Sequence, residues 1–256
     1  METQDMNKAQ GHWVLAKMGK RVLRPGGKQL TERMIGALEI SPDDDIAEFA
    51  PGMGFTASLA LEHHPRSYIG IDADADAVAA LKQKFRGGNV RFQLGSAADT
   101  NLEAGKLDKV YGEAMLTMHA DHRKAEIVRE ACRILKKGGL YAIHELGLTS
   151  ENEELNTRIR KELATSIKVN ARPLSEAEWT ELLENEGFKV RQVFKGEMLL
   201  LEPKRVVDDE GLPRALRIAF NVLTYSDARK RIGEMRKVFR RYRDQMNAVA
   251  LIAEKV

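Results

Sequence analysis

The chain has 256 residues, of which 43% are hydrophobic and 31% are charged, and its formal net charge is +3. This length is sufficient to bury one large core, and so small a net charge does not by itself indicate a nucleic-acid partner. No apolar run reaches 18 residues, no signal-peptide core follows the polar start Met1–Asp5, and the one cysteine, Cys132, excludes an internal disulfide and a cysteine-based zinc cluster. We therefore expect a cytoplasmic protein without a metal site.

The first elements are expected to be two helices between about Trp13 and Leu38. They are interrupted at Arg24-Pro25-Gly26-Gly27, where a proline and paired glycines disfavour a continuous helix. We assign residues 1–40 to an N-terminal helical cap. In this cap, His12 and Trp13 either belong to a lid over a ligand or only pack the helix against its neighbours.

Short apolar runs alternate with helix-like stretches between Asp45 and Leu148, within a core unit assigned to residues 41–204. The expected strands are Ile46–Phe49, Tyr68–Asp72, Val90–Leu94, Lys109–Glu113 and Leu140–Leu146, and the expected helices are Thr56–Glu62, Ala75–Phe85 and His122–Leu135, the last ended by Lys136 to Gly139. This alternation predicts right-handed βαβ units and a doubly wound α/β fold with a parallel sheet.

The second half of the chain mixes further helices with a few strands. The expected elements are two helices within Glu151–Gly187, with Ser175 as N-cap and Glu178 completing a capping box, an alternating strand through Val193, an apolar strand over Met198–Leu201, helices over Pro213–Leu223 and Asp227–Tyr242, and a buried strand over Ala248–Ala253. We assign residues 205–243 to a helical insertion or lid, and residues 244–256 to the core sheet.

A glycine turn follows the first expected strand, in Glu48-Phe49-Ala50-Pro51-Gly52-Met53-Gly54. Glycine allows the backbone to approach a ligand closely, and the start of the next helix offers free N–H groups. Asp72 ends the second strand, where its carboxylate can accept hydrogen bonds from both hydroxyls of a ribose. Asp72 has a plainer alternative, which is to cap the next helix. The turn and the acid together predict a ligand that contains adenosine.

The glycine turn alone leaves two cofactors open. Gly52 to Ala57 fits the G-x-G-x-x-A form of dinucleotide-binding proteins, so an NAD-dependent dehydrogenase is one interpretation. Glu48 argues for the other, because a carboxylate beside the turn repels a pyrophosphate but attracts the sulfonium and ammonium groups of S-adenosylmethionine.

Several short motifs then resemble one family. Glu48-x-Ala50-x-Gly52-x-Gly54, Gly70-Ile71-Asp72, Gly95-Ser96-Ala97, Asp108-Lys109-Val110 and Leu135 to Gly139 occur in this order. The order resembles the class I S-adenosylmethionine-dependent methyltransferases, and most closely their UbiE-like, type 11 branch. The resemblance covers about residues 40–148 and extends to Leu174–Phe188. It implies a seven-stranded Rossmann-like sheet with helices on both faces and an antiparallel last strand, and an enzyme whose product is S-adenosylhomocysteine.

The resemblance also implies a set of cofactor-binding positions. These are Glu48, Ala50, Pro51, Gly52 and Gly54 at the methionine part, Asp72 and Ala73 at the ribose, Ser96 and Ala97 at the adenine, and Glu113 and Ala114 beneath the sulfonium. Three of these positions depart from the family pattern. Ala50 stands where glycine is usual, Pro51 lacks a backbone donor, and Ser96 stands where an aspartate often contacts the adenine amine.

The catalytic residues are harder to name, because methyl transfer mainly requires alignment and needs a base only when the acceptor loses a proton. The candidates are His119, Glu113 and His144. His119 is favoured because it follows the strand expected beneath the donor methyl. The alternatives are a solvated loop histidine for His119 and a hydrogen-bonded core histidine for His144. His122 is expected only to start a helix.

The acceptor is expected to be a small molecule. No Asn/Asp-Pro-Pro-Tyr motif follows the fourth strand, and Cys132 lies in the middle of a helix, so the known routes to adenine, glutamine and cytosine C5 methylation do not fit. The alternative is RNA, since residues 229–243 carry eight Lys/Arg against one acid, Glu234. We expect that helix to bury its apolar side and solvate its charges. The oligomeric state stays open, a homodimer included.

Overall fold

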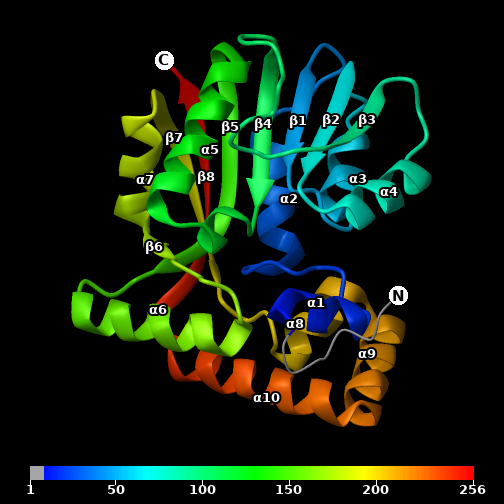
Figure 1. Cartoon of the computed structure of the whole chain (residues 1–256), viewed down its shortest axis with the longest axis vertical. Coiled ribbons are helices and arrows are strands. Elements are labelled where there is room, and N and C mark those ends of the chain that lie inside the picture. Colours follow the sequence, from blue (N-terminus) through cyan, green and yellow to red (C-terminus); the bar gives the residue numbers. More distant parts are fainter. Residues whose placement is uncertain (1–8) are drawn as a thin grey trace.

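A single twisted sheet organises the fold. The computed structural model describes residues 9–256, and in it the strand order is β3-β2-β1-β4-β5-β8-β7, with the short β6 paired to β5 (Figure 1). The strands are β1 (Asp45–Phe49), β2 (Ser67–Asp72), β3 (Val90–Leu94), β4 (Leu107–Glu113), β5 (Leu135–Leu148), β6 (Leu174–Ser175), β7 (Phe188–Glu197) and β8 (Met246–Lys255). Strands β1 to β5 pair in parallel, whereas β8 lies antiparallel between β5 and β7. The predicted doubly wound sheet with an antiparallel last strand is confirmed.

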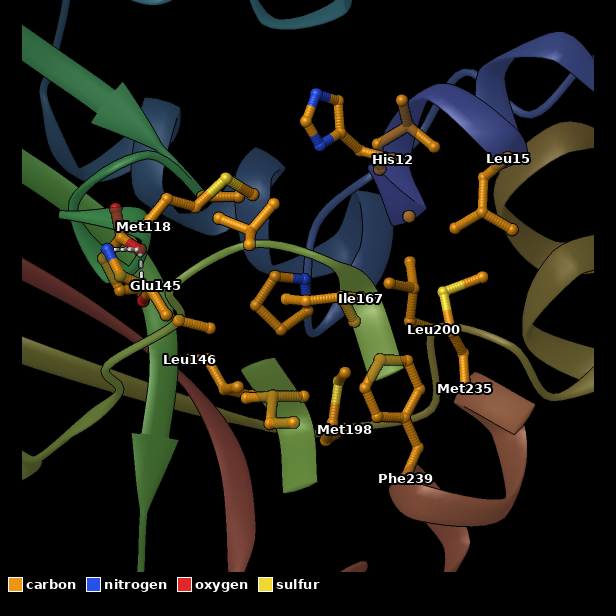
Figure 2. A pocket seen from close by; sticks show the side chains of 18 residues that line it. His12, Leu15, Met118, Glu145, Leu146, Ile167, Met198, Leu200, Met235 and Phe239 are labelled. Atoms are coloured by element: carbon orange, nitrogen blue, oxygen red, sulfur yellow. Dashed lines mark hydrogen bonds between the residues drawn. The ribbon is translucent and has the colours of Figure 1, made fainter. Parts of the chain in front are cut away.

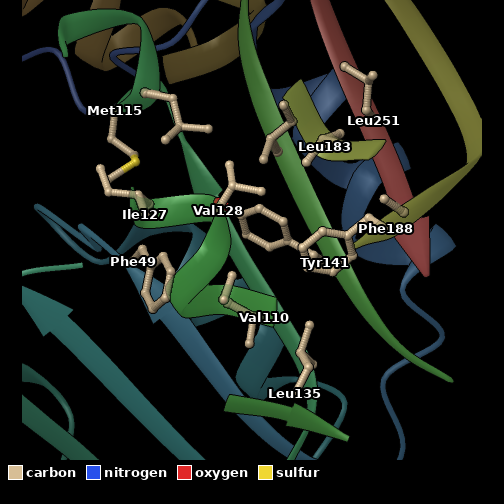
Figure 3. Packing of buried hydrophobic residues seen from close by; sticks show 14 of the residues in the cluster. Phe49, Val110, Met115, Ile127, Val128, Leu135, Tyr141, Leu183, Phe188 and Leu251 are labelled. Atoms are coloured by element: carbon tan, nitrogen blue, oxygen red, sulfur yellow. The ribbon is translucent and has the colours of Figure 1, made fainter. Parts of the chain in front are cut away.

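Helices cover both faces of this sheet. The covering helices are α2 (Gly27–Ala37), α3 (Phe55–Leu61) and α4 (Ala75–Lys84) on one face, and α5 (Asp121–Ile134) and α7 (Glu176–Asn185) on the other. Alternate strand residues enter opposite cores. Ile46 packs with the first group, whereas Phe49 packs with the second, which Figure 3 shows. This period of two is the physical reason why the strands could be located from sequence.

A third layer of helices lies beyond the carboxyl ends of the parallel strands, at the lower end of Figure 1. This helical cover consists of α1 (Gly11–Lys17), α6 (Glu153–Ile167), α8 (Pro203–Glu210), α9 (Leu212–Thr224) and α10 (Ser226–Arg241). Its core is continuous with the end of β5, because Leu146 packs with Leu163 of α6 and Phe239 of α10. Leu15 of α1 belongs to the same core, so α1 shares this cover with α6 and α10, whereas the other N-terminal helix, α2, packs on a face of the sheet. Within residues 9–256, no helix has the length and apolarity needed to cross a membrane.

Two local predictions need correction. The apolar segment Met198–Leu201 is not a strand; β7 ends at Glu197 and the chain leaves the sheet for α8. Met198, Leu200 and Leu201 are nevertheless buried, under the helical cover, because an apolar run reports burial and not strand pairing. The segment Lys136 to Gly139 does not cap α5, since that helix ends at Ile134 and passes directly into β5.

The capping prediction for α7 is confirmed. Ser175 is the N-cap, and its hydroxyl accepts a hydrogen bond from the Glu178 N–H over 3.2 Å. The Glu178 carboxylate in turn accepts one from the Ser175 N–H over 2.6 Å. This reciprocal pair fixes the start of α7 beside the end of β5.

Candidate functional site

The glycine turn after β1 lies where the order of the parallel strands reverses, between β1 and β4. Ligands of doubly wound sheets bind at this point. Gly52 and Gly54 have φ of 54° and 69°. A Cβ on Gly54 would lie 2.5 Å from Leu81, whereas one on Gly52 would meet nothing closer than the Ala50 oxygen at 3.9 Å. Gly54 thus allows α4 to pack against the turn, and Gly52 leaves open space beside it.

Two alanines at the same point adopt a backbone conformation that is unusual for them. Ala50 follows β1 with φ 53°, and Ala114 follows β4 with φ 52°. Both still donate to a neighbouring strand, Ala50 to the Ile71 oxygen over 2.8 Å and Ala114 to the His144 oxygen over 2.7 Å. Left-handed alanine costs about 1–3 kcal/mol, and such strain clusters at functional sites. The positive φ also explains why glycine is usual at the position of Ala50.

Asp72 at the end of β2 faces the glycine turn. Its carboxylate accepts hydrogen bonds from the N–H groups of Gly52 and Asp74, each over 2.9 Å. The cap of α4 is instead Asp74, whose side chain accepts from Asp76 N and Ala77 N. An ionised carboxylate has roughly four acceptor positions, so Asp72 keeps about two for a ligand. The capping alternative for Asp72 is therefore wrong, and its carboxylate remains available for the predicted ribose.

One exposed apolar side chain, that of Leu94, precedes the predicted adenine positions in the chain. Ser96 and Ala97 are half-buried after β3, and Ala73 is exposed after β2. The side chain of Leu94 is 59% exposed there, and the Ser96 hydroxyl accepts a hydrogen bond from Arg123 of α5 over 2.7 Å. Leu94 and Arg123 were not predicted as site residues. Leu94 could have been found, because it ends a predicted strand, whereas only the fold brings Arg123 next to Ser96.

Glu48 lies beneath the turn and not on its surface. The carboxyl group is enclosed and accepts hydrogen bonds from the hydroxyls of Tyr68, over 2.5 Å, and Tyr111, over 3.0 Å. Burial raises the pKa of Glu48 to about 7, although both phenols oppose the shift. At neutral pH the side chain thus carries only a partial negative charge. Glu48 therefore attracts a sulfonium or ammonium group less strongly than the fully ionised carboxylate expected from the sequence.

Glu113 at the end of β4 belongs to a buried network. One of its oxygens accepts hydrogen bonds from Thr31 and from His144 Nδ1, each over 2.7 Å, and the other accepts from Arg24 and Thr56. Burial alone would raise the pKa of this carboxyl group, but Arg24, His144 and Thr56 outweigh burial and bring it to about 2. Glu113 is therefore ionised, and its acceptor positions are filled.

His144 on β5 is held from both sides. Its Nδ1 faces Glu113 over 2.7 Å, and its Nε2 faces the carbonyl oxygen of Pro25 over 2.6 Å. Both ring nitrogens are therefore occupied by contacts within the protein. The ring is buried and has no lone pair free for a ligand. The loop containing Arg24 and Pro25, which the sequence identified only as a helix break, thus closes over the ends of β4 and β5.

An apolar cavity of about 80 Å³ adjoins the end of β4 (Figure 2). Its walls come from α1, α6, α10, the ends of β4 and β5 and the segment after β7. The lining residues include Leu15, Leu23, Pro25, Ala114, Met118, Leu146, Leu163, Ile167, Met198, Leu200, Met235 and Phe239. Glu145 also lines it, but that carboxylate is occupied by the N–H groups of Met115, Leu116 and Thr117 and by the Thr117 hydroxyl.

His12 is the polar side chain of this cavity that stays unpaired. Its Nδ1 is buried and has no hydrogen-bond partner among residues 9–256. Burial lowers the pKa of His12, and Asp74 partly offsets this. The imidazole is therefore neutral, and the influence of Asp74 places it near the loop after β2. Trp13, its expected companion in a lid, is exposed.

The other predicted histidines lie elsewhere. His119 follows a short 3₁₀ helix (Leu116–Met118) and does not line the apolar cavity. Burial, with Arg123 and Lys124 nearby, lowers its pKa. His122 is exposed in the first turn of α5, as expected. His12 is thus nearer to the cavity than the histidine favoured from sequence.

The basic stretch 229–243 is largely occupied by contacts within the protein. Arg236 and Arg240 both bind Glu202, and Arg241 binds Glu162. Arg231 is buried and donates to the backbone of Ser166 and Ala9. Most of these cations therefore hold α10 to its neighbours, as expected from sequence for a helix that buries its apolar side.

Comparison with known proteins gives consistent results. A family model described as a methyltransferase domain matches residues 46–139. An uncharacterized protein of Haemophilus influenzae is 30% identical over 249 residues, which cover 96% of this chain and 98% of that protein. A probable S-adenosylmethionine-dependent methyltransferase of Mycolicibacterium smegmatis is 28% identical over 59% of this chain and 56% of its own length.

Part of the chain is also similar to an RNA methyltransferase, and the whole chain is similar in fold to a solved structure. Ribosomal RNA small subunit methyltransferase A of Synechococcus is 31% identical over 34% of this chain and 30% of its own length. The cyclopropane synthase MmaA2 of Mycobacterium tuberculosis shares the fold with a TM-score of 0.72, covering 99% of both chains at 13% identity.

Proposed function

The chain belongs to the class I S-adenosylmethionine-dependent methyltransferases, and we propose that it methylates a small, largely apolar acceptor held in the cavity beside Ala114. One observation carries the proposal. The cavity adjoins the strand end predicted to lie beneath the donor methyl, and its walls are almost entirely apolar. The narrower assignment to the UbiE-like branch stays a prediction.

The residues of the crevice fit the cofactor. Gly52 leaves space where a Cβ would project, Asp72 retains acceptor positions for ribose hydroxyls, and Leu94 offers an exposed apolar side chain for the adenine. When bound, S-adenosylmethionine supplies an electrophilic methyl group. The protein contributes the alignment of donor and acceptor and the exclusion of water, which the apolar walls achieve.

We assign the role of proton acceptor to His12 rather than to the histidines favoured from sequence. A neutral imidazole with an unpaired, buried Nδ1 can accept a proton or hydrogen bond from an acceptor hydroxyl or amine. Glu113 and His144 lack free acceptor positions, so we assign them to positioning. Together with Arg24 they hold the loop 24–27 over the ends of β4 and β5.

RNA is the second candidate acceptor, because three relatives that each match about a third of the chain are ribosomal RNA methyltransferases. The cations of α10 offer it little, since Arg236, Arg240 and Arg241 are paired with carboxylates. RNA binding needs cations free to contact phosphates. A small apolar acceptor therefore agrees better with the structure.

The test is a methylation screen with a matched pair of variants. Purified protein and isotope-labelled S-adenosylmethionine are incubated with cell extract, and label is measured in organic-soluble metabolites and in RNA. We expect label in the organic phase. Leu163→Phe fills the cavity from α6, so it should keep cofactor affinity and lose at least about tenfold in turnover. The control Val256→Phe, on an exposed position away from the cavity, should behave as wild type. Label in RNA alone, or full turnover by Leu163→Phe, would refute the proposal.

A further inference from the structure

The outer face of α9 is a row of exposed apolar side chains. Leu212, Leu216, Phe220 and Leu223 are each 59–68% exposed, and their spacing of four, four and three residues puts them on one side of the helix. The side toward the protein carries Ala215 and Ile218, which are buried. Five of the ten large hydrophobic side chains that are exposed within residues 9–256 lie in residues 212–225. We call the row of four the α9 ridge.

Cations border the α9 ridge, and acids are missing from it. No Asp or Glu occurs between Leu212 and Ser226. Arg217 lies on α9 next to the ridge in the helical sequence, and Arg229 reaches the ridge because it donates to the Leu223 carbonyl over 3.0 Å. Within the described residues, neither arginine forms an ion pair. They differ in this respect from the arginines of α10 farther along the chain.

We propose that the α9 ridge docks the protein onto an anionic lipid surface, with α9 lying in the plane of the interface. A helix with Leu and Phe on one side and unpaired arginines at its edge has the pattern of an interfacial helix. The leucines and Phe220 would enter the boundary between headgroups and acyl chains. Arg217 and Arg229 would contact lipid phosphates.

The same charges argue against two other partners. In a symmetric contact between two copies the ridge would face itself, and Arg217 and Arg229 of both copies would meet with no acid on α9 to neutralise them. RNA would pair with the arginines but would leave four apolar side chains facing a polyanion. Only the lipid surface fits both the apolar centre and the cationic edge.

The position of α9 connects this surface to the active site. Asn221 of α9 donates to the Met18 carbonyl at the end of α1 over 3.0 Å. Helix α1 in turn carries His12 and Leu15, which line the acceptor cavity. Figure 1 shows α9 at the outer side of the helical cover. Docking would thus bring the cover of the cavity to the bilayer, where apolar acceptors dissolve. The docking itself does not depend on the acceptor that we propose.

The test is flotation of the full-length protein with two kinds of vesicle, phosphatidylcholine alone and phosphatidylcholine mixed with phosphatidylglycerol. We expect the wild type to float with the mixed vesicles and to release at high salt. The double variant Leu216→Ser/Phe220→Ser should lose at least about tenfold in binding. Arg217→Gln should lose about fivefold, on anionic vesicles alone. Lys137→Gln, an exposed cation at the start of β5, should have no effect.

The fold and oligomeric state of each variant are followed by circular dichroism and gel filtration. Because the ridge is exposed, we expect all variants to fold and to bind S-adenosylmethionine as the wild type does. The proposal is overturned if the wild type does not float with anionic vesicles, or if the double variant floats equally well. It is also overturned if the wild type is a dimer that the double variant converts to a monomer while vesicle binding persists. Failure of the proposed function would appear separately, in the turnover of Leu163→Phe.

Discussion

Glu48 should make the stability of this protein decrease as pH rises through neutrality. Folding raises the pKa of this carboxyl group from 4.5 to about 7, because it is buried beneath the glycine turn. The folded state therefore favours the protonated form. Its contribution to stability is fully present below pH 4.5 and is lost as pH rises through about 7. At about 1.4 kcal/mol for each pKa unit, the loss amounts to about 3 kcal/mol.

Replacing Glu48 by Gln tests this reasoning. The amide keeps the shape and an oxygen acceptor for Tyr68 and Tyr111, but it does not titrate between pH 5 and 8. Urea unfolding at several pH values should show that the wild type loses about 2.5 kcal/mol relative to the variant over this range, which is most of the full effect. Glu113 does not interfere, because its pKa of about 2 places its own effect below pH 4.5, where its contribution decreases as pH falls. Parallel pH profiles for wild type and variant would refute a buried, protonated Glu48.

Three further predictions concern the active site. Asp72→Ala should weaken S-adenosylmethionine binding about 10- to 100-fold by calorimetry, through loss of charged hydrogen bonds. The helix-cap variant Asp74→Ala should instead lose only about 1 kcal/mol of stability. If Asp72→Ala bound the cofactor as tightly as the wild type, the ribose assignment would be contradicted. Gly54→Ala should destabilise the fold because of the clash with α4, whereas Gly52→Ala should mainly abolish cofactor binding, and the reverse outcome would reject our interpretation of the turn. His12→Asn should lower kcat about 10²- to 10⁴-fold at unchanged cofactor affinity. Because the pKa of His12 lies below 6.5, wild-type activity should rise with pH below that value, and the variant should lack this rise. An unchanged pH profile in the variant would exclude His12 as the proton acceptor.

The elements of the core sheet could be predicted because they depend on local pattern. The strands β1 to β4 alternate or repeat apolar residues with the period of a pleated strand. Helix boundaries have local signals too, such as the Ser175 cap of α7 and the break at Pro25 before α2. The glycine turn and Asp72 were recognisable for the same reason, since each lies directly beside the strand that it ends. The segment Met198–Leu201 is apolar like a strand but pairs with none. Its apolarity indicated burial correctly, but not the partner that buries it.

The chemistry of the site was decided by contacts between residues far apart in the chain. Arg24 and His144 are separated by 120 positions, yet both bind Glu113, and together they remove two predicted catalytic groups from the list of available bases. From the sequence Glu48 is expected to be fully charged. In the fold it is only partly charged at neutral pH, since Tyr68 and other core residues exclude water from it. A pKa depends on solvation and neighbours in three dimensions. The sequence by itself therefore determined the sheet, the turn and the cofactor, whereas tertiary packing decided which side chains are free to act and created the cavity beside His12.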